Sequence, residues 1–294
     1  MKKIRFLLEY FFLMVFTYFF RLFPLSFNLW LARGIGLLLF RVNKTHRNRA
    51  LENLRFSYPG KPEPELYNIA RKTYVNLSKV FMEFLVMPGL NGKYYGTRVK
   101  LIGRENLDRA LRQKKGIVAI SGHLDNWELL GAILVRSGYH LDAVYHPMKN
   151  PFSDRFFNRI REKTGIKLIS MDNPLRPSLR ALKENHMLGL IADQDAGSDS
   201  VFVPFFNRLA PTYKGPALFS IKTGAPMILI TLVRDEKDNH TMYISEPLNV
   251  KVTGDLKQDL YYNTKLWSDE LEKWIKKYPE QWYWVHRRWH SRPR

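Results

Sequence analysis

Three ionisable side chains in one short stretch have the types and spacing that proton transfer requires. His123, Asp125 and Glu128 follow closely on residues 117–120, an unbroken apolar run. An imidazole that donates from one ring nitrogen to a carboxylate can take a proton from an attacking hydroxyl on its other nitrogen. The stretch therefore indicates general base catalysis, with His123 as the base and Glu128 as its expected carboxylate partner.

The spacing of His123 and Glu128 requires two different elements to position them. Five residues correspond to about 140° around a helix, so a single helix would hold these side chains on different faces. If residues 117–120 form a buried strand and a helix begins near Asp125 or Asn126, His123 lies on the loop and Glu128 in the first turn. Open α/β sheets usually place their sites at such a strand end, and the helix N-terminus favours an ionised carboxylate.

The same residues have two other interpretations. Asp125 and Glu128 have the spacing of a capping box, which many helices carry for stability alone. His123, Asp125 and Glu128 could also ligate the metal of a hydrolase, although no second histidine stands nearby at a ligand spacing. We expect no metal and no other cofactor. Loss of activity with chelators would favour the metal interpretation instead.

A group of cations follows the strand expected at residues 141–145. Arg155, Arg159 and Arg161 would then lie near the same sheet edge as His123. Guanidinium groups there could hold a phosphate or stabilise an oxyanion. A solvated basic helix face is the alternative, above all for Arg155 and Arg159.

A second pair of carboxylates follows the apolar strand expected at residues 187–192. Asp193 and Asp195 stand at its C-terminal end. The next segment, residues 201–206, is more hydrophobic than an exposed loop would be. It could line a pocket for an acyl chain, and packing in the core is the alternative.

The composition limits the possible partners. The chain has 294 residues, 45% hydrophobic and 14% aromatic, so it can bury a substantial core and is not disordered. Its 47 Lys and Arg against 27 Asp and Glu give a net charge of +20. Such a surface attracts nucleic acid, anionic lipid or acidic protein. The absence of cysteine excludes disulfides and thiolate metal sites.

The N-terminal region favours lipid among these partners. Residues 6–20 are apolar apart from Glu9, and a second apolar stretch spans residues 22–40. The first run is shorter than the roughly 20 residues that cross a bilayer, and no small-residue cleavage site follows it. We expect residues 1–40 to be a membrane anchor, either a tilted span or a pair of interfacial helices. A buried core helix is the alternative.

Beyond residue 40, apolar strands alternate with amphipathic helices. Strands are expected at 99–103, 117–120, 141–145, 166–170, 187–192 and 226–233, with an edge strand at 242–244. The helices run from a long one over 66–84 to a C-terminal one over 264–275. This alternation predicts an α/β fold in which residues 41–294 form one domain. Its core would be a single mixed, mostly parallel sheet with helices on both faces.

Aromatic side chains interleave with cations at the C-terminal end, over residues 279–294. Rings and long cationic side chains both find favourable depths at a membrane interface. The same pattern would also suit single-stranded nucleic acid.

Several motifs together resemble one known family. The segment Gly122-His-Leu-Asp-Asn-Trp-Glu-Leu, with histidine and acid separated by four residues, resembles the HX4D/E motif of glycerolipid-type acyltransferases. Further marks resemble the lipid A biosynthesis (lauroyl/myristoyl) acyltransferase family: Asn150-Pro with Arg161, Ala192-Asp-Gln-Asp195, Phe202-Val-Pro-Phe-Phe206, Thr212 with Gly215, Pro279-Glu-Gln-Trp and His286-Arg-Arg-Trp-His-Ser-Arg-Pro293. They occur in the family's order and cover the chain from the N-terminal anchor to its last residues.

The resemblance implies a glycerol-3-phosphate acyltransferase-like fold and an enzyme on the cytoplasmic face of a bacterial inner membrane. It would move a fatty acyl group from acyl-carrier protein, or from acyl-CoA, onto a hydroxyl of a lipid A precursor. His123 would be the base and Glu128 its partner. Arg161 would act electrostatically and Asp193 would be a further site residue. We also expect Asn126 and Arg159 among the electrostatic or substrate-binding residues.

The sequence is also compatible with two other functions. Relatives of the family acylate other membrane lipids, including mannosides and amino-acid lipids, so the acceptor could be one of these. A non-catalytic protein that binds anionic membrane would also explain the charge and the aromatic tail. We expect no nucleic acid partner in either case. Such a binder would keep its function after His123→Ala, whereas the enzyme would lose orders of magnitude in rate.

Overall fold

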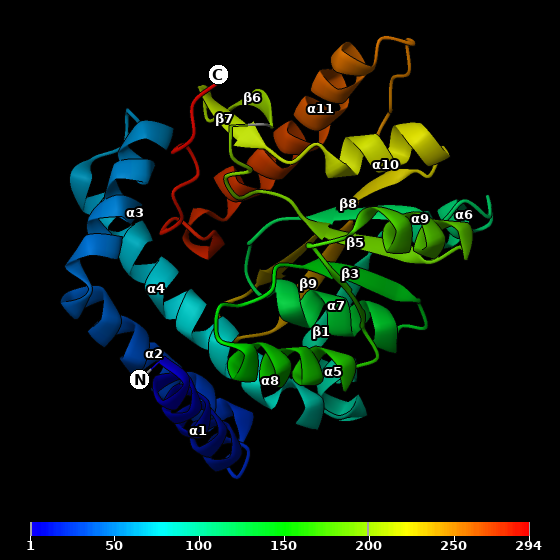
Figure 1. The fold of residues 1–294 in the computed structure, drawn as a ribbon. Helices are drawn as coiled ribbons and strands as arrows, with labels where there is room; N and C mark the ends of the chain where they lie inside the picture. Colours follow the sequence, from blue (N-terminus) through cyan, green and yellow to red (C-terminus); the bar gives the residue numbers. More distant parts are fainter. Residues whose placement is uncertain (1, 199, 294) are drawn as a thin grey trace.

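A seven-stranded mixed sheet forms the centre of the computed structural model, which describes residues 2–198 and 200–293 (Figure 1). The strand order is β1-β9-β8-β2-β5-β3-β4. β8, β2, β5, β3 and β4 run parallel, β9 is antiparallel to β8, and β1 is parallel to β9. The bounds are Val99–Ile102 (β1), Ile117–Ser121 (β2), Leu141–Tyr145 (β3), Lys167–Ser170 (β4), Met187–Ile191 (β5), Met227–Arg234 (β8) and His240–Ile244 (β9). The predicted fold class is confirmed.

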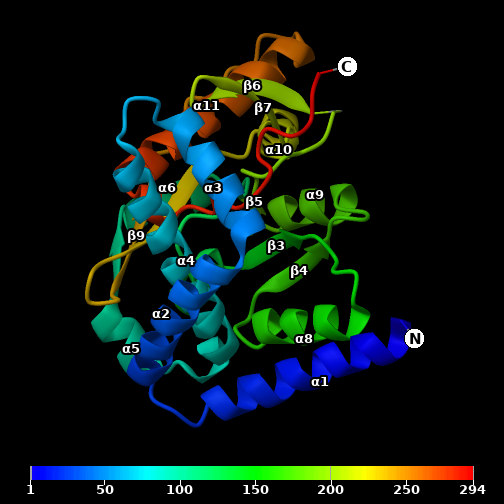
Figure 2. The ribbon, with the colours of Figure 1, turned by 90° about the vertical axis from the view of Figure 1, so that its left-hand side faces the viewer.

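Helices cover both faces of the sheet (Figures 1 and 2). Their bounds are Lys2–Phe20 (α1), Leu25–Val42 (α2), Lys44–Ser57 (α3), Glu63–Val86 (α4), Gly92–Arg98 (α5), Arg104–Leu111 (α6), Trp127–Arg136 (α7), Pro151–Glu162 (α8), Leu175–Lys183 (α9), Gly215–Thr223 (α10) and Leu256–Lys277 (α11). Short 3-10 helices span Met87–Gly89 (η1) and Pro279–Gln281 (η2).

The strand β2 is apolar throughout because both of its faces are covered. It lies between β5 and β8, and all of its residues are buried. Val118 and Ile120 pack in one core cluster with residues of α9, α10 and α11. Ile117 and Ala119 pack in the other, with residues of α7 and α8. An apolar run without alternation is typical of such a parallel strand, and it delivers the chain after Ser121 to the middle of one sheet edge.

The strand predicted at the edge of the sheet is in the interior. β9 lies between β1 and β8, so β1 is the edge strand. The prediction was wrong because the sequence signal for Met242–Ile244 was too short to reveal that β1 pairs beside it.

The hydrophobic segment after Asp195 forms a hairpin that packs in the core. Strands Val201–Phe205 (β6) and Arg208–Thr212 (β7) pair antiparallel, and both turn residues, Phe206 and Asn207, have positive φ, as a type I′ turn requires. Phe205 and Phe206 are buried among core residues, and β6 packs on α11. The interpretation of residues 201–206 as pocket lining is therefore wrong, and core packing is confirmed.

The two N-terminal helices have one face on the protein and one face open. α2 packs on α4, and α1 packs on α8 and α4. Gly36 permits the close approach, because a Cβ there would stand 2.7 Å from the Tyr74 carbonyl oxygen. The open faces carry large exposed apolar side chains: Leu7, Leu8, Phe11, Phe12, Val15, Phe19, Leu22, Phe27, Trp30, Leu38, Leu39 and Val42. By length and composition alone, Leu25–Val42 could cross a membrane.

Candidate active site

The loop between β2 and α7 places the histidine and the acid on the elements that the spacing predicts. His123 lies on this loop, and α7 begins at Trp127, so Glu128 is in its first turn. The helix is capped by Asn126, whose side-chain oxygen accepts a backbone N–H of the first turn at 2.9 Å. The capping-box interpretation is therefore wrong, because Asp125 does not cap this helix.

His123 is bound by Asp193 rather than by Glu128. Its Nδ1 lies 2.6 Å from Oδ1 of Asp193, and its backbone N–H donates to Oδ2 at 2.7 Å. Within the described residues no hydrogen bond joins Glu128 to His123, so the predicted pairing is wrong. The reason is topological: β5 lies beside β2, and Asp193 follows the parallel strand at the same sheet edge.

Asp193 is ionised in a buried position. Burial alone would raise the pKa of this carboxyl, but the electrostatic attraction of the His123 imidazole and the hydrogen bonds from His123 and Trp282 lower it to about 2. The Trp282 indole N–H donates to Oδ2 at 2.7 Å. An ionised Asp193 keeps a proton on Nδ1 of His123, which leaves Nε2 free to accept one.

Gly122 allows the backbone of the loop to come this close to Asp193. A Cβ at this position would stand 2.8 Å from Oδ2 of Asp193 and 2.7 Å from Cδ2 of Leu271. Any side chain at residue 122 would therefore push the carboxylate, the helix α11 or the loop away.

The second ring nitrogen of His123 faces Gln194. The two Nε2 atoms are 3.1 Å apart, and the amide donates to the imidazole if Nδ1 carries the ring proton. The imidazole is 17% exposed, and the rings of Trp127 and Tyr283 lie 4.6 and 5.9 Å from it. Gln194 thus occupies the place from which a substrate hydroxyl would have to reach Nε2.

Glu128 is bound to Arg161 of α8. Nε and Nη2 of Arg161 donate to the two carboxylate oxygens at 2.8 and 2.6 Å. Burial alone would lower the pKa of Arg161, but Glu128 raises it, so the guanidinium stays charged. Its charged group also lies 5.5 Å from the centre of the Phe84 ring. Arg161 therefore lies at the site, as the sequence predicts, and its ion pair with Glu128 holds it there.

An apolar cavity of about 360 Å³ borders these groups. His123, Gln194, Glu128 and Arg161 all contribute to its wall. Most of the remaining wall is aliphatic or aromatic and comes from the sheet and from α7 and α10; it includes Leu130, Leu134, Leu141, Ile166, Leu190 and Phe219. A few polar groups at one part of an apolar cavity are typical of a site that holds a hydrocarbon chain beside a reacting group.

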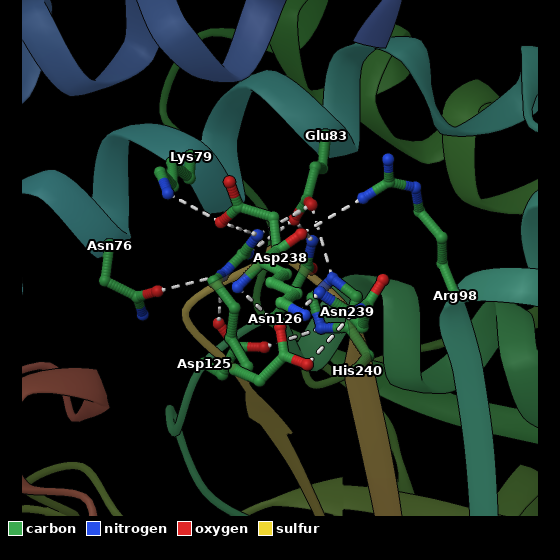
Figure 3. A network of polar contacts seen from close by, with 12 residues as sticks. Asn76, Lys79, Glu83, Arg98, Asp125, Asn126, Asp238, Asn239 and His240 are labelled. Atoms are coloured by element: carbon green, nitrogen blue, oxygen red, sulfur yellow. Dashed lines mark hydrogen bonds and ion pairs between the residues drawn. The ribbon is translucent and has the colours of Figure 1, made fainter. Parts of the chain in front are cut away.

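A buried network of ionised side chains holds the loop from behind (Figure 3). Asp125 has a φ of 46°, and its carboxylate lies 3.1 Å from Arg234 and 2.9 Å from His240. Glu83 of α4 accepts two bonds from Arg234, at 2.8 and 2.6 Å, and lies 3.2 Å from His240. Asn126 donates to Glu83 at 2.8 Å.

The opposite charges of this network stabilise one another. Burial would raise the pKa values of Glu83 and Asp125, but Arg234 and His240 hold both below their ordinary values. Burial would lower the pKa of His240, and the two carboxylates raise it. Asp125 and Asn126 are fully buried here, so they fix the loop and are not placed to touch a ligand or metal in the cavity.

The C-terminal segment supports the same loop. The Tyr283 N–H donates to the His123 carbonyl oxygen at 3.1 Å, and the Asp125 N–H donates to the Gln281 carbonyl oxygen at 2.8 Å. Trp282 holds Asp193, as described above, and its ring is buried in the core together with Trp284 and Trp289. The interpretation that these tryptophans sit at a membrane interface is therefore wrong, because they pack in the core instead.

Arg159 lies apart from the site. It is exposed on α8 and lines a small groove with residues of α1, whereas Arg161 on the same helix reaches the cavity. Sequence reasoning missed Gln194, Trp282, Arg234 and His240. Gln194 stands in the Ala192-Asp-Gln-Asp195 motif and Trp282 in the Pro279-Glu-Gln-Trp motif, but neither motif assigns these residues a role. Nothing near Arg234 or His240 in the sequence points to Asp125.

These features define an α/β enzyme in which a histidine–carboxylate pair stands at the end of a parallel strand, beside an apolar cavity. Residues 1–291 match the bacterial lipid A biosynthesis acyltransferase family. The chain belongs to this family and is an acyltransferase.

Several curated relatives extend along most of the chain. A lipid A biosynthesis palmitoleoyltransferase of Escherichia coli is 27% identical over 90% of this chain and 85% of its own length. A lipid A biosynthesis acyltransferase of Haemophilus influenzae is 24% identical over 87% and 79%. A phosphatidylinositol mannoside acyltransferase of Mycolicibacterium smegmatis is 24% identical over 83% and 81%.

Proposed function

We propose that this enzyme transfers a fatty acyl chain from a thioester donor to a hydroxyl of a lipid A precursor, with His123 as general base. The donor is acyl-carrier protein or acyl-CoA. The observation that carries the proposal is the position of His123, which is held by the ionised Asp193 on one side and borders the apolar cavity on the other.

The reaction is a direct displacement at the thioester carbon. The acceptor hydroxyl replaces Gln194 at Nε2 of His123 and gives up its proton there as its oxygen bonds to the carbonyl carbon. Asp193 stabilises the imidazolium that forms. The carbon–sulfur bond then breaks, and the thiolate of the donor takes the proton from Nε2. The acyl chain lies in the cavity, where apolar walls exclude water from the reacting carbonyl.

Arg161 supplies a positive charge next to this centre. A guanidinium that is fixed by a bidentate carboxylate costs little reorganisation when negative charge develops nearby. In this scheme Glu128 is a positioning residue for Arg161, and the arginine stabilises the oxyanion or a phosphate of the acceptor.

The protein acts at a membrane surface, and we place it at the cytoplasmic face of a bacterial inner membrane. The supporting observation is the apolar open face of α1 and α2, including Phe12 and Trp30, which are 67% and 69% exposed. Residues 1–40 are then the anchor. The net charge of +20 favours encounter with both anionic lipid and an acidic carrier protein.

A different membrane-lipid acceptor is the second candidate. It is favoured by the similarity to the Mycolicibacterium smegmatis enzyme, whose name specifies a phosphatidylinositol mannoside. The same catalytic groups would serve it, because both reactions transfer an acyl chain to a hydroxyl and need a base for its proton.

The test is acyl transfer in vitro from a radiolabelled acyl thioester, with lipid A precursor and phosphatidylinositol mannoside as parallel acceptors. We expect His123→Ala to lower kcat by about 10²–10⁴-fold. The control is His186→Ala, since His186 also pairs with a carboxylate, Asp142 at 2.7 Å, but does not line the cavity. Equal rates for the two variants would exclude His123 as the base. Product with only one acceptor would identify the acceptor class.

A further inference from the structure

A second, smaller groove lies between α1 and α8, on the side of α8 away from the catalytic cavity. Its volume is about 100 Å³. From the α1 side it is lined by Tyr10, Met14, Tyr18 and Arg21, and from α8 and its C-terminal end by Phe156, Arg159, Ile160 and Lys163. It thus combines three cations with aromatic and apolar walls.

Arg21 carries a charge that has no counter-ion in the described part of the chain. Its guanidinium is partly buried and donates twice, at 3.0 and 2.8 Å, to the carbonyl oxygen of Leu85. It also lies 5.6 Å from the centre of the Tyr18 ring. Burial lowers the pKa of Arg21, and the neighbouring Tyr18 only partly offsets this. An anion in the groove would supply the missing compensation.

Arg159 and Lys163 add two cations one helical turn apart. In the described residues neither forms an ion pair, and the acidic residue of α1, Glu9, is already bound by Arg5 and Asn150. Like charges at this spacing repel each other. The dipole of α8 favours a cation at its C-terminal end, and Arg21 caps the last turn of α4 through the Leu85 carbonyl oxygen. These backbone dipoles carry only partial charges, so among the described residues the three cations still lack a full counter-charge.

The surroundings of the groove identify the source of the anion. Tyr18, which lines the groove, is 55% exposed, and Leu22 beside Arg21 is 80% exposed. Both continue the apolar open face of α1. A lipid phosphate is the anion that comes with hydrocarbon next to it, whereas an acidic protein surface does not.

We propose that the groove between α1 and α8 binds the phosphate of an anionic membrane phospholipid, with Arg21, Arg159 and Lys163 as its ligands. The bound lipid fixes α1 to the bilayer surface. It also fixes the depth of α8 relative to the bilayer. The opposite side of this helix carries Arg161, which lines the catalytic cavity. The proposal concerns binding alone, so it stands or falls independently of the acyl transfer reaction.

The experiment compares vesicle binding of the full chain and two double variants. Arg159→Gln/Lys163→Gln removes the two exposed cations of the groove. Arg112→Gln/Lys183→Gln removes the same charges from exposed positions just after α6 and at the end of α9, two helices that lie away from α1 (Figures 1 and 2). Vesicles of phosphatidylcholine contain either none or about 5 mol% phosphatidylglycerol, in about 0.3 M NaCl, where diffuse attraction to the surface is weak.

We expect the wild type and the control variant to bind vesicles with phosphatidylglycerol about tenfold more tightly than vesicles of pure phosphatidylcholine, because each cation at an anionic lipid surface contributes about 1 kcal/mol. The groove variant should lose this preference. Binding to pure phosphatidylcholine should be equal for all three proteins, because the apolar face of α1 is unchanged. Equal preference in the groove and control variants would overturn the proposal. So would an equal loss of binding to both kinds of vesicle, since that would indicate a general defect in membrane docking.

Discussion

At the scale of single residues, the catalytic histidine depends on a carboxylate that lies 70 positions further along the chain. Asp193 meets the requirements for this role, because it is buried, ionised and bonded to both the ring and the backbone of His123. Glu128 has the spacing of the motif but a different task, since its two oxygens are taken by Arg161.

Replacement of Asp193 tests the first assignment. We expect Asp193→Asn to lower kcat by about 10²–10⁴-fold, because the amide no longer stabilises the imidazolium or the correct ring tautomer. Asp142→Asn is the matched control, since it weakens the pair with His186 outside the cavity. Steady-state kinetics and circular dichroism of both variants provide the measurement. A rate for Asp193→Asn close to that of the control would contradict the assignment.

Asp193 also makes the free energy of unfolding depend on pH in the acid range. The pKa of Asp193 is lowered from 3.8 to about 2 on folding, so its contribution is complete above pH 3.8. That contribution is lost as the pH falls toward 2. We therefore expect the difference in unfolding free energy between wild type and Asp193→Asn to shrink below pH 4. Urea unfolding at a series of pH values measures this difference; a constant value from pH 7 to pH 2.5 would contradict the shift.

Glu128 and Arg161 are expected to act as one unit. Glu128→Gln and Arg161→Gln should each lower kcat, and the double variant should be little worse than either single one, because each removes the same ion pair. Glu128→Gln combined with Asp193→Asn should instead be close to additive in free energy of activation. A double-mutant cycle on kcat/KM distinguishes the two cases. Strong coupling of Glu128 to Asp193 and weak coupling to Arg161 would contradict the assignment of Glu128 as the positioning residue of Arg161.

At the scale of elements, the strands and helices were predictable and the contacts between them were not. The runs at 117–120 and 187–192 are apolar because β2 and β5 lie in the interior of the sheet and are largely buried, and this local cause leaves a local signal. The pairing of His123 with Asp193 arises from strand order, which no local pattern encodes. The tryptophans of the C-terminal segment illustrate the same limit, because aromatic residues near cations look alike at a membrane and in a core.

The buried ionic network of Glu83, Asp125, Arg234 and His240 holds the loop between β2 and α7, so its disruption should destabilise the fold. Arg234→Met should destabilise the fold by about 3–5 kcal/mol, because it leaves Glu83 and Asp125 buried without their main counter-charge. Arg109→Met is the control: Arg109 pairs with Glu246 on the surface, where such a pair contributes about 0–1 kcal/mol. Urea unfolding compares the two. Equal losses would show that the buried charges do not stabilise the loop.

At the scale of the whole molecule, α8 separates the catalytic cavity from the groove beside α1. Arg161 of α8 lines the cavity, whereas Phe156, Arg159 and Ile160 of the same helix line the groove. The open apolar face belongs to α1 and α2, which pack on α8 and α4. The basic charge of the chain acts over longer distances and is screened by salt, whereas the apolar face acts only on contact. Binding at high salt to uncharged vesicles therefore isolates the contribution of the face.

Charge introduced into that face should release the protein from uncharged membranes. We expect Phe12→Glu/Trp30→Glu to reduce partition onto phosphatidylcholine vesicles by at least about tenfold, since burying a carboxylate in the interface opposes insertion. Val252→Glu/Leu256→Glu places the same charges on exposed apolar residues far along the chain and should change partition by less than about twofold. Flotation of each variant with vesicles gives the measurement. If both variants float like the wild type, the open face of α1 and α2 is not the membrane-binding surface, and residues 1–40 serve packing alone.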